Sequence, residues 1–172
     1  MYWAVPSWRG RKIVLLVASY LFYAAWNPPF VLLLLMSTMV DFVLGKRMVS
    51  ATHQRTRRLL LIASLAVNLG VLAWFKYAKF FLASFVGVME SMGIAYSPPE
   101  LSIVLPVGIS FYTFQTLSYT IDLYRRRIDP CDSILDFAIF VSFFPQLVAG
   151  PIVRASEFLG QLKQPRRFSW EH

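Results

Sequence analysis

Long stretches without charge constrain the fold of this chain most strongly. Ile13 to Leu44 carries one charged residue, Asp41, while Leu59 to Phe75 and Leu101 to Ile121 carry none. A transmembrane helix needs about 20 mostly apolar residues. The composition agrees, because 57% of the residues are hydrophobic against about 45–50% in soluble domains. The sequence therefore predicts an all-α fold, a polytopic transmembrane helical bundle.

Proline positions divide the first of these stretches. One helix from Ile13 to Leu44 would be about 48 Å long, which exceeds the roughly 30 Å hydrocarbon core. The "NPPF" at 27–30 predicts a break, because Pro29 forces Pro28 out of the helical region and neither proline can donate. We expect one membrane domain over 1–172 with about four to five membrane segments. The hydrophobic segments lie at about 13–26, 28–44, 59–77, 104–124 and 134–153.

Basic residues lie between the apolar stretches. The net charge is +8, and the basic positions gather before residue 13, in a predicted loop at 45–58, and at Arg125–Arg127. Lys and Arg beside membrane segments mark the cytoplasmic side, whereas a nucleic-acid binder would gather them on one face. Lys76 and Lys79 fit headgroup anchors. We therefore expect the lipid bilayer as a partner, no nucleic acid, and a multi-pass location in the cell inner membrane.

The last hydrophobic segment allows two topologies. A single crossing would place Arg154 and the later basic residues outside, against the pattern of the rest of the chain. A helix broken near Pro145 or Gly150 that re-enters would keep them inside. Irregular backbone at membrane depth requires a protein interior or a water-filled cavity around it. We favour re-entry, with a crossing as the alternative.

A polar stripe follows one face of the predicted helix at 104–124. Gly108, Tyr112, Gln115, Tyr119 and Asp122 recur at intervals of four, three, four and three residues, which places them on one helical face. Polar side chains at this depth should face the bundle. The stripe fits either helix–helix packing with hydrogen bonds or one wall of a substrate path.

Three charged residues near the apolar stretches can be interpreted from their neighbours in the sequence. Asp122 can pair with Arg125 and Arg126, three and four residues later. Asp41 can pair in the same way with the basic residues at 46–47. Arg154, beside the predicted break, either sets topology or forks onto a carboxylate or phosphate.

Recognisable catalytic motifs are absent from the sequence. It contains no nucleophile elbow, P-loop, zinc-protease motif or dinucleotide fingerprint. His53 lies in the basic loop and His172 ends the sequence, so both fit solvated side chains. The single Cys131 excludes an internal disulfide, and no Cys/His cluster has metal-binding spacing. We expect Cys131 to pack within a loop, and we assign no metal and no catalytic residue.

Four stretches resemble a known family. "LPVGISFYTFQTLSYTIDLYR" and "DFAIFVSFFPQLVAGPIVR" closely resemble bacterial membrane-bound O-acyltransferases (MBOAT), especially the alginate O-acetyltransferase-like branch. "LLVASYLFYAAWNPPF" and "WFKYAKFF" are similar to it in the same order, so the resemblance extends from about Ile13 to Pro165. It implies a multi-helix enzyme that takes acyl groups from a cytoplasmic donor such as acetyl-CoA. The acceptor would be an extracytoplasmic polysaccharide such as alginate, frequently with periplasmic acetylation partner proteins.

The resemblance also implies which residues matter. The family's catalytic histidine lies on a later membrane helix and has no counterpart here, so we expect an amino-terminal portion that lacks part of the first helix and is inactive alone, with no covalently bound cofactor. The alternatives are a non-enzymatic membrane subunit, a transporter element or an inactive relic. The candidate motif or tunnel residues are Gly108, Ser110, Phe114, Gln115, Tyr119, Asp122, Pro145, Gln146, Gly150, Pro151 and Arg154.

Overall fold

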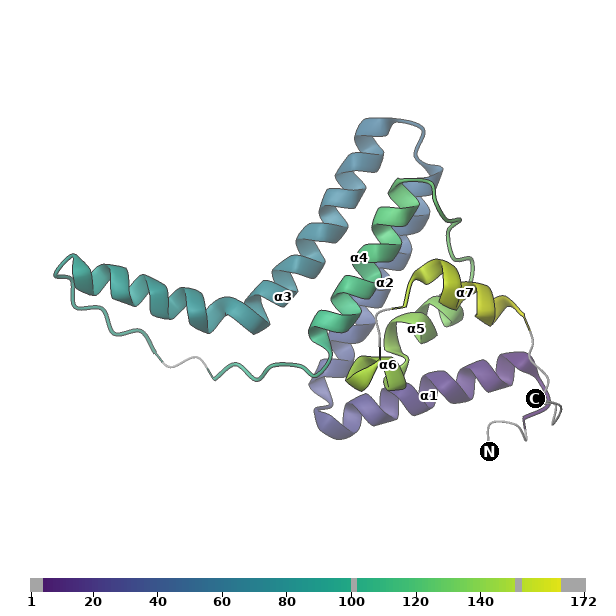
Figure 1. Cartoon of the computed structure of the whole chain (residues 1–172), viewed down its shortest axis with the longest axis horizontal. Helices are drawn as coiled ribbons and strands as arrows, with labels where there is room; N and C mark the ends of the chain where they lie inside the picture. The colour runs from purple at the N-terminus through teal and green to yellow at the C-terminus, as the bar shows by residue number, and fades with distance from the viewer. Residues whose placement is uncertain (1–4, 100–101, 151–152, 165–172) are drawn as a thin grey trace.

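Helices make up the regular structure of the part of the chain that the computed structural model describes, residues 5–99, 102–150 and 153–164 (Figure 1). No strand occurs within these ranges, so the predicted all-α class is confirmed for them. The helices are α1 (Trp8–Trp26), α2 (Pro29–Ser50), α3 (Gln54–Ser91), α4 (Ile109–Tyr124), α5 (Ile134–Ser142), α6 (Phe144–Ala149) and α7 (Ala155–Lys163).

The core forms where α2, α4 and the first half of α3 lie side by side. α1 crosses the lower end of this group, and α5, α6 and α7 fill the angle between α1 and α4 (Figure 1). Tyr119 of α4 is fully buried against Phe137 of α5, with 4.7 Å between the ring centroids. Phe137 in turn stacks on Phe140 at 6.0 Å. Aromatic side chains thus join α5 to the group formed by α2, α4 and the first half of α3, which we call the three-helix group.

The predicted break at residues 27–30 is confirmed, but the predicted conformation of Pro28 is wrong. α1 ends at Trp26 and α2 begins at Pro29. Asn27 is the extended residue, with φ −159° and ψ 105°, while Pro28 is helical with φ −53° and ψ −43°. Asn27 also precedes a proline and takes the extended conformation. Pro29 then fits the first helical position, where its missing N–H costs nothing.

Length and composition confirm only part of the predicted set of membrane segments. Among the described residues, α2 with 22 residues and α3 with 38 are long and apolar enough to span a bilayer. α4 has 16 residues because the chain is irregular before Gly108. The prediction of four to five segments is therefore not confirmed. The predicted third segment also continues beyond residue 77, to Ser91.

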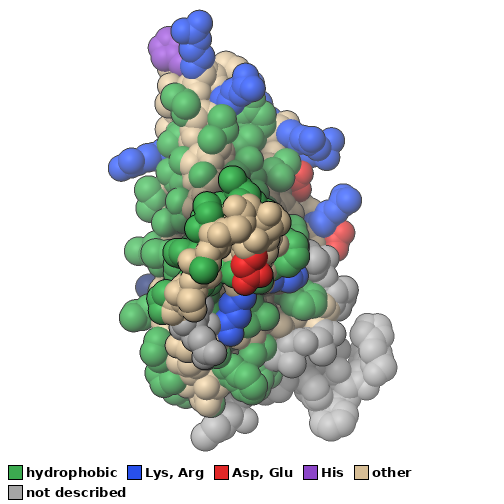
Figure 2. All heavy atoms as spheres, turned by 90° about the vertical axis from the view of Figure 1, so that its left-hand side faces the viewer, with side chains coloured by type: hydrophobic (Ala, Val, Ile, Leu, Met, Phe, Trp, Pro, Cys, Tyr) green, Lys and Arg blue, Asp and Glu red, His purple; other side chains and the backbone are tan. Residues whose placement is uncertain are grey.

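Basic side chains gather at the end of the bundle where α2 and α3 are joined. Figure 2 shows lysine or arginine side chains and a histidine at this end. The connection is shorter than the predicted loop at 45–58, because α2 continues to Ser50 and α3 begins at Gln54. Arg55 and Arg58 are exposed on the first turns of α3. This is the end that the positive-inside rule predicts to be cytoplasmic.

The last hydrophobic segment is interrupted twice. α5 ends at Ser142, Phe143 takes φ −58° and ψ 103°, and α6 ends before an extended Gly150. The break predicted near Pro145 or Gly150 thus occurs at Phe143, two residues before Pro145, and again at Gly150. α5 has nine residues and is about 14 Å long. Neither short helix can cross the hydrocarbon core.

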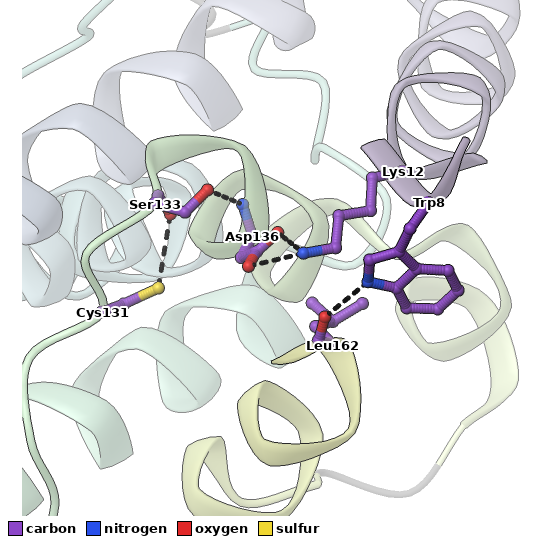
Figure 3. Close-up of polar contacts among 6 residues, drawn as sticks. All are labelled: Trp8, Lys12, Cys131, Ser133, Asp136 and Leu162. Atoms are coloured by element: carbon purple, nitrogen blue, oxygen red, sulfur yellow. Dashed lines mark hydrogen bonds and ion pairs between the residues drawn. The ribbon is translucent and has the colours of Figure 1, made fainter. Parts of the chain in front are cut away.

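This broken segment leaves one end of α1 and returns to it. At its start, Asp136 binds Lys12 of α1, with the ammonium 2.7 and 2.8 Å from the two carboxylate oxygens. In its middle, the ring of Phe144 lies 5.3 Å from that of Phe22, ten residues beyond Lys12 along α1. At the end of α7, the Leu162 carbonyl accepts a hydrogen bond from Trp8 Nε1 at 3.0 Å (Figure 3).

Cys131 packs within the loop before α5, which confirms its expected structural role. It is buried, its N–H donates to the Tyr119 hydroxyl at 3.0 Å, and its thiol donates to the Ser133 carbonyl at 3.3 Å (Figure 3). Burial raises the pKa of the Cys131 thiol. Because the thiolate is the reactive form, a raised pKa agrees with a packing role for this cysteine.

Candidate functional site

The two most distinctive motif segments meet at Gln115. This buried side chain of α4 donates from Nε2 to the Phe140 carbonyl oxygen at 2.7 Å and to Gln146 Oε1 at 3.3 Å. The last carbonyls of a helix lack partners within it, and Phe140 lies in the last turn of α5. Gln115 therefore supplies a donor where α5 ends and connects α4 to the break.

Gly108 brings the start of α4 directly onto α6. Its φ is +73°, in the left-handed region, and a methyl group added there would lie 2.8 Å from the Leu147 carbonyl oxygen. Gly150 is similarly tight, since a methyl group there would lie 2.6 Å from Gln146 Cα. Glycine is the residue that tolerates such close approach and a positive φ. Both glycines thus hold α6 in place beside Gln115.

Replacement of Gly108 by alanine should destabilise the fold. The left-handed conformation costs about 1–2 kcal/mol for a residue with a side chain, and the clash with Leu147 displaces α6. Gly87→Ala is the matched control, because nothing lies within 4 Å of that added methyl group and alanine favours a helix interior by about 0.5–1 kcal/mol. Thermal unfolding in detergent should show a lower midpoint for Gly108→Ala only. Equal midpoints for the two variants would contradict this packing.

A hollow lies beside this junction. Its volume is about 350 Å³ and its lining is almost wholly apolar. At the edge of this hollow, the Tyr23 hydroxyl donates a hydrogen bond to the Val107 carbonyl at 2.8 Å. Tyr112 of the polar stripe is buried. The lining residues are Phe22, Tyr23, Ala25, Trp26, Val107 and Leu147. The lining suits an apolar group.

Two further members of the stripe have structural surroundings. Tyr119 is fully buried and accepts from the backbone of the loop after α4. Asp122 is half-buried and pairs with Arg127 at 4.0 Å. The predicted pairing of Asp122 with Arg125 and Arg126 is wrong, because α4 ends at Tyr124 and Arg126 takes a φ of +57°. Helical spacing therefore no longer applies to these two arginines.

The other candidates are divided by the structure. Phe114 is 48% exposed, on the outer side of α4 away from Gln115. Ser110 is half-buried, Pro145 is exposed in the first turn of α6, and Arg154 is exposed at the start of α7. Pro151 lies outside the described residues. The candidates brought together around α6 are Gly108, Gln115, Gln146 and Gly150.

A buried carboxylate that the sequence reasoning misread lies at the centre of the three-helix group. Asp41 of α2 is fully buried and accepts from Ser64 Oγ at 2.5 Å and from Asn68 Nδ2 at 3.0 and 2.9 Å. The expected pairing with the basic residues at 46–47 is wrong, since Asp41 faces α3 and Lys46 donates to the Asp132 carbonyl.

Hydroxyl groups extend this network into all three helices. Ser37 of α2 donates to Asn68 Oδ1 at 2.8 Å, and Thr116 of α4 lies 3.4 Å from the same oxygen. Ser64 also lies 3.3 Å from Thr120 Oγ1. The sequence did contain a signal, because each helix contributes a polar pair four residues apart inside an apolar stretch. The pairs are Ser37 and Asp41, Ser64 and Asn68, and Thr116 and Thr120.

Arg57 is a second residue whose role was missed. It is 3% exposed although it belongs to the basic end of the bundle. Its guanidinium donates to the carbonyls of Met48 at 3.1 Å, Leu123 at 3.3 Å and Tyr124 at 3.1 Å. These carbonyls end α2 and α4, where partners are lacking and a positive charge is favourable. Arg57 thus connects three helix ends.

Comparison with known proteins finds relatives that are named as O-acetylases or O-acetyltransferases. It is 42% identical over 156 residues to the probable alginate O-acetylase AlgI of Pseudomonas aeruginosa, covering 89% of this chain and 29% of that protein. For AlgI of Azotobacter vinelandii the identity is 37%, covering 94% and 32%. For the peptidoglycan O-acetyltransferase of Helicobacter pylori it is 34%, covering 88% and 32%.

The matches cover most of this chain but only part of each relative. The chain spans about three-tenths of the length of these curated relatives. No family model matches the sequence, and no solved structure does. The match to the P. aeruginosa protein nevertheless covers 89% of this chain. By these matches the chain is of the membrane-bound O-acyltransferase type, similar to a fragment of the alginate O-acetylases and of a peptidoglycan O-acetyltransferase.

Proposed function

We propose that this chain forms part of a multi-pass inner-membrane O-acetyltransferase that acts on an exopolysaccharide such as alginate. The observation that carries the proposal is the contact of Gln115 with Phe140 and Gln146, because it joins the two segments that define the family resemblance. The names of the relatives, alginate O-acetylase and peptidoglycan O-acetyltransferase, support an extracytoplasmic glycan as the acceptor.

The role that we propose for this chain is to build one wall of the acyl-transfer path. The hollow beside α1, α4 and α6 supplies an apolar surface, and Gln115 fixes the broken helix that borders it. Asp136 near its beginning and Leu162 near its end both contact the first turns of α1, which supports a 134–163 segment that re-enters and does not cross. In this arrangement irregular backbone is enclosed by protein, as membrane depth requires.

The acid–base group of the reaction would come from outside the described residues. His53 is exposed between α2 and α3, far from the polar junction in the fold, and His172 lies outside the described residues. A general base needs a protected site near the reacting hydroxyl. Acetyl-CoA or a similar cytoplasmic donor and periplasmic acetylation proteins complete the proposed system. The chain alone is therefore expected to transfer no acetyl groups.

A chimera tests this function. The matching region of P. aeruginosa AlgI would be replaced by this chain and expressed in cells that lack AlgI, and the acetyl content of secreted alginate would be measured. We expect acetylation by the chimera and none by this chain expressed alone. A chimera that reaches the membrane at the level of AlgI but leaves alginate unacetylated would favour the non-enzymatic membrane subunit. Acetylation by the chain alone would refute the scaffold role.

A further inference from the structure

The second half of α3 leaves the bundle. The buried residues of this fully described helix are Arg57, Ser64, Asn68 and Leu72, all in its first half. From Trp74 to Ser91, a part that we call the arm, no residue is buried. Figure 1 shows the arm running away from the bundle, across the direction of α2 and α4.

α3 is too long for all of it, the arm included, to fit within a single membrane crossing. The 38 residues of α3 extend over about 57 Å, and the hydrocarbon core is roughly 30 Å thick. The 15 residues 59–73, which follow the exposed Arg58, cover about 22 Å of it. They begin at the basic, cytoplasmic end and contain Ser64 and Asn68 of the buried network. The arm therefore begins near the opposite membrane surface, within the depth of about 5–10 Å that interfacial helices reach.

The arm has two distinct faces with the same helical spacing. Its hydrophobic face is exposed, at fractions between 43% and 61%. That face consists of Trp74, Tyr77, Phe81, Phe85 and Val88, at intervals of three, four, four and three residues. The opposite face consists of Lys76, Lys79, Ala83, Gly87 and Glu90, at the same intervals. Such spacing defines an amphipathic helix.

The two faces point in opposite directions relative to the bundle. Figure 2, which looks at the free end of the arm, shows hydrophobic side chains on its upper side and charged side chains on its lower side. The upper direction is that of the basic end where α2 meets α3. If that end is cytoplasmic, the hydrophobic face points into the bilayer and the charged face points out of it.

We propose that the arm lies in the plane of the outer membrane–water interface and binds lipid. Its aromatic face enters the acyl-chain region, as in interfacial amphipathic helices, and Trp and Tyr are preferred at that depth. Lys76 and Lys79 extend to the lipid phosphates, whose negative charge they complement. The partner is thus the bilayer itself, and the surface anchors the crossing half of α3 at a fixed depth.

Spin labelling of paired sites tests this placement. In a Cys131→Ser background, Phe81→Cys and Phe85→Cys report the hydrophobic face, and Ala83→Cys and Gly87→Cys are matched controls on the other face. Each nitroxide-labelled chain is reconstituted in phosphatidylcholine–phosphatidylglycerol vesicles and exposed to oxygen, which concentrates in lipid, and to a water-soluble nickel chelate. We expect a ratio of oxygen to nickel accessibility that is several-fold higher at positions 81 and 85.

Other outcomes would overturn the proposal. Equal ratios at all four positions would place the arm wholly in water or wholly in lipid. Exclusion of both reagents at positions 81 and 85 would show that protein covers the aromatic face, either a second copy or another helix. As a further check, Lys76→Gln with Lys79→Gln should lower the ratio at position 81 in vesicles with phosphatidylglycerol, and no change would remove the role of lipid phosphates.

Discussion

Asp41→Ala is expected to lower the free energy of unfolding by about 3 kcal/mol, since a buried donor left without its acceptor costs about 1–3 kcal/mol. The substitution removes the acceptor for the Ser64 hydroxyl and the Asn68 amide, both fully enclosed between α2, α3 and α4. Neither donor can reach water in the folded bundle. Unfolding in detergent micelles, followed by circular dichroism, measures the change.

Asp41→Asn is the matched control for that substitution. Its side-chain oxygen can still accept from both Ser64 and Asn68, because both already donate to Asp41 Oδ1. We expect a loss of about 1 kcal/mol, the typical contribution of one hydrogen bond. Wild-type stability of Asp41→Ala would show that the network does not hold the helices together. An equal loss in both variants would assign the effect to the charge instead.

Arg57→Ala is expected to have the second-largest effect, a loss of about 2–3 kcal/mol, because hydrogen bonds from a charged group contribute about 1.5–3 kcal/mol. The guanidinium reaches three carbonyls at the ends of α2 and α4. Without it these oxygens remain buried and a cavity is left in the space of the side chain.

The neighbouring Arg58→Ala is the control for Arg57. Arg58 has the same chemistry and almost the same position in the sequence, but it is exposed. Substitution of such a surface residue changes stability by less than about 0.5 kcal/mol. The same unfolding measurement should separate the two variants clearly. Equal losses would mean that both arginines act only through the net charge of this end of the bundle.

Local chemistry made the helical class and several features of the site predictable. The paired prolines at 28 and 29 break the first apolar stretch whatever surrounds them, and α1 and α2 divide there. The interval pattern of the stripe placed Tyr112, Gln115 and Tyr119 on the buried face of α4, as observed. Each of these features depends on residues close together in the sequence.

Features that depend on distant residues were missed. The partners of Asp41 come from α3 and α4, and those of Arg57 from α2 and α4. Nearby opposite charges therefore seemed the natural partners for Asp41. The position where α3 ends was also not predictable, because no residue marks a stop. No proline occurs between residues 54 and 91, and isolated glycines such as Gly70 are tolerated in a helix.

The most direct test of the central claim compares Gln115→Ala with Phe114→Ala in the AlgI chimera. Gln115 holds the broken segment, whereas its neighbour Phe114 faces outward. A displacement of about 1 Å at a reacting site can cost 100-fold in rate. We predict at least a tenfold loss (about 1.4 kcal/mol) of alginate acetylation for Gln115→Ala, at equal chimera levels in the membrane, and near-normal acetylation for Phe114→Ala. Equal acetylation by the two variants would contradict the claim that this junction forms a wall of the acyl-transfer path.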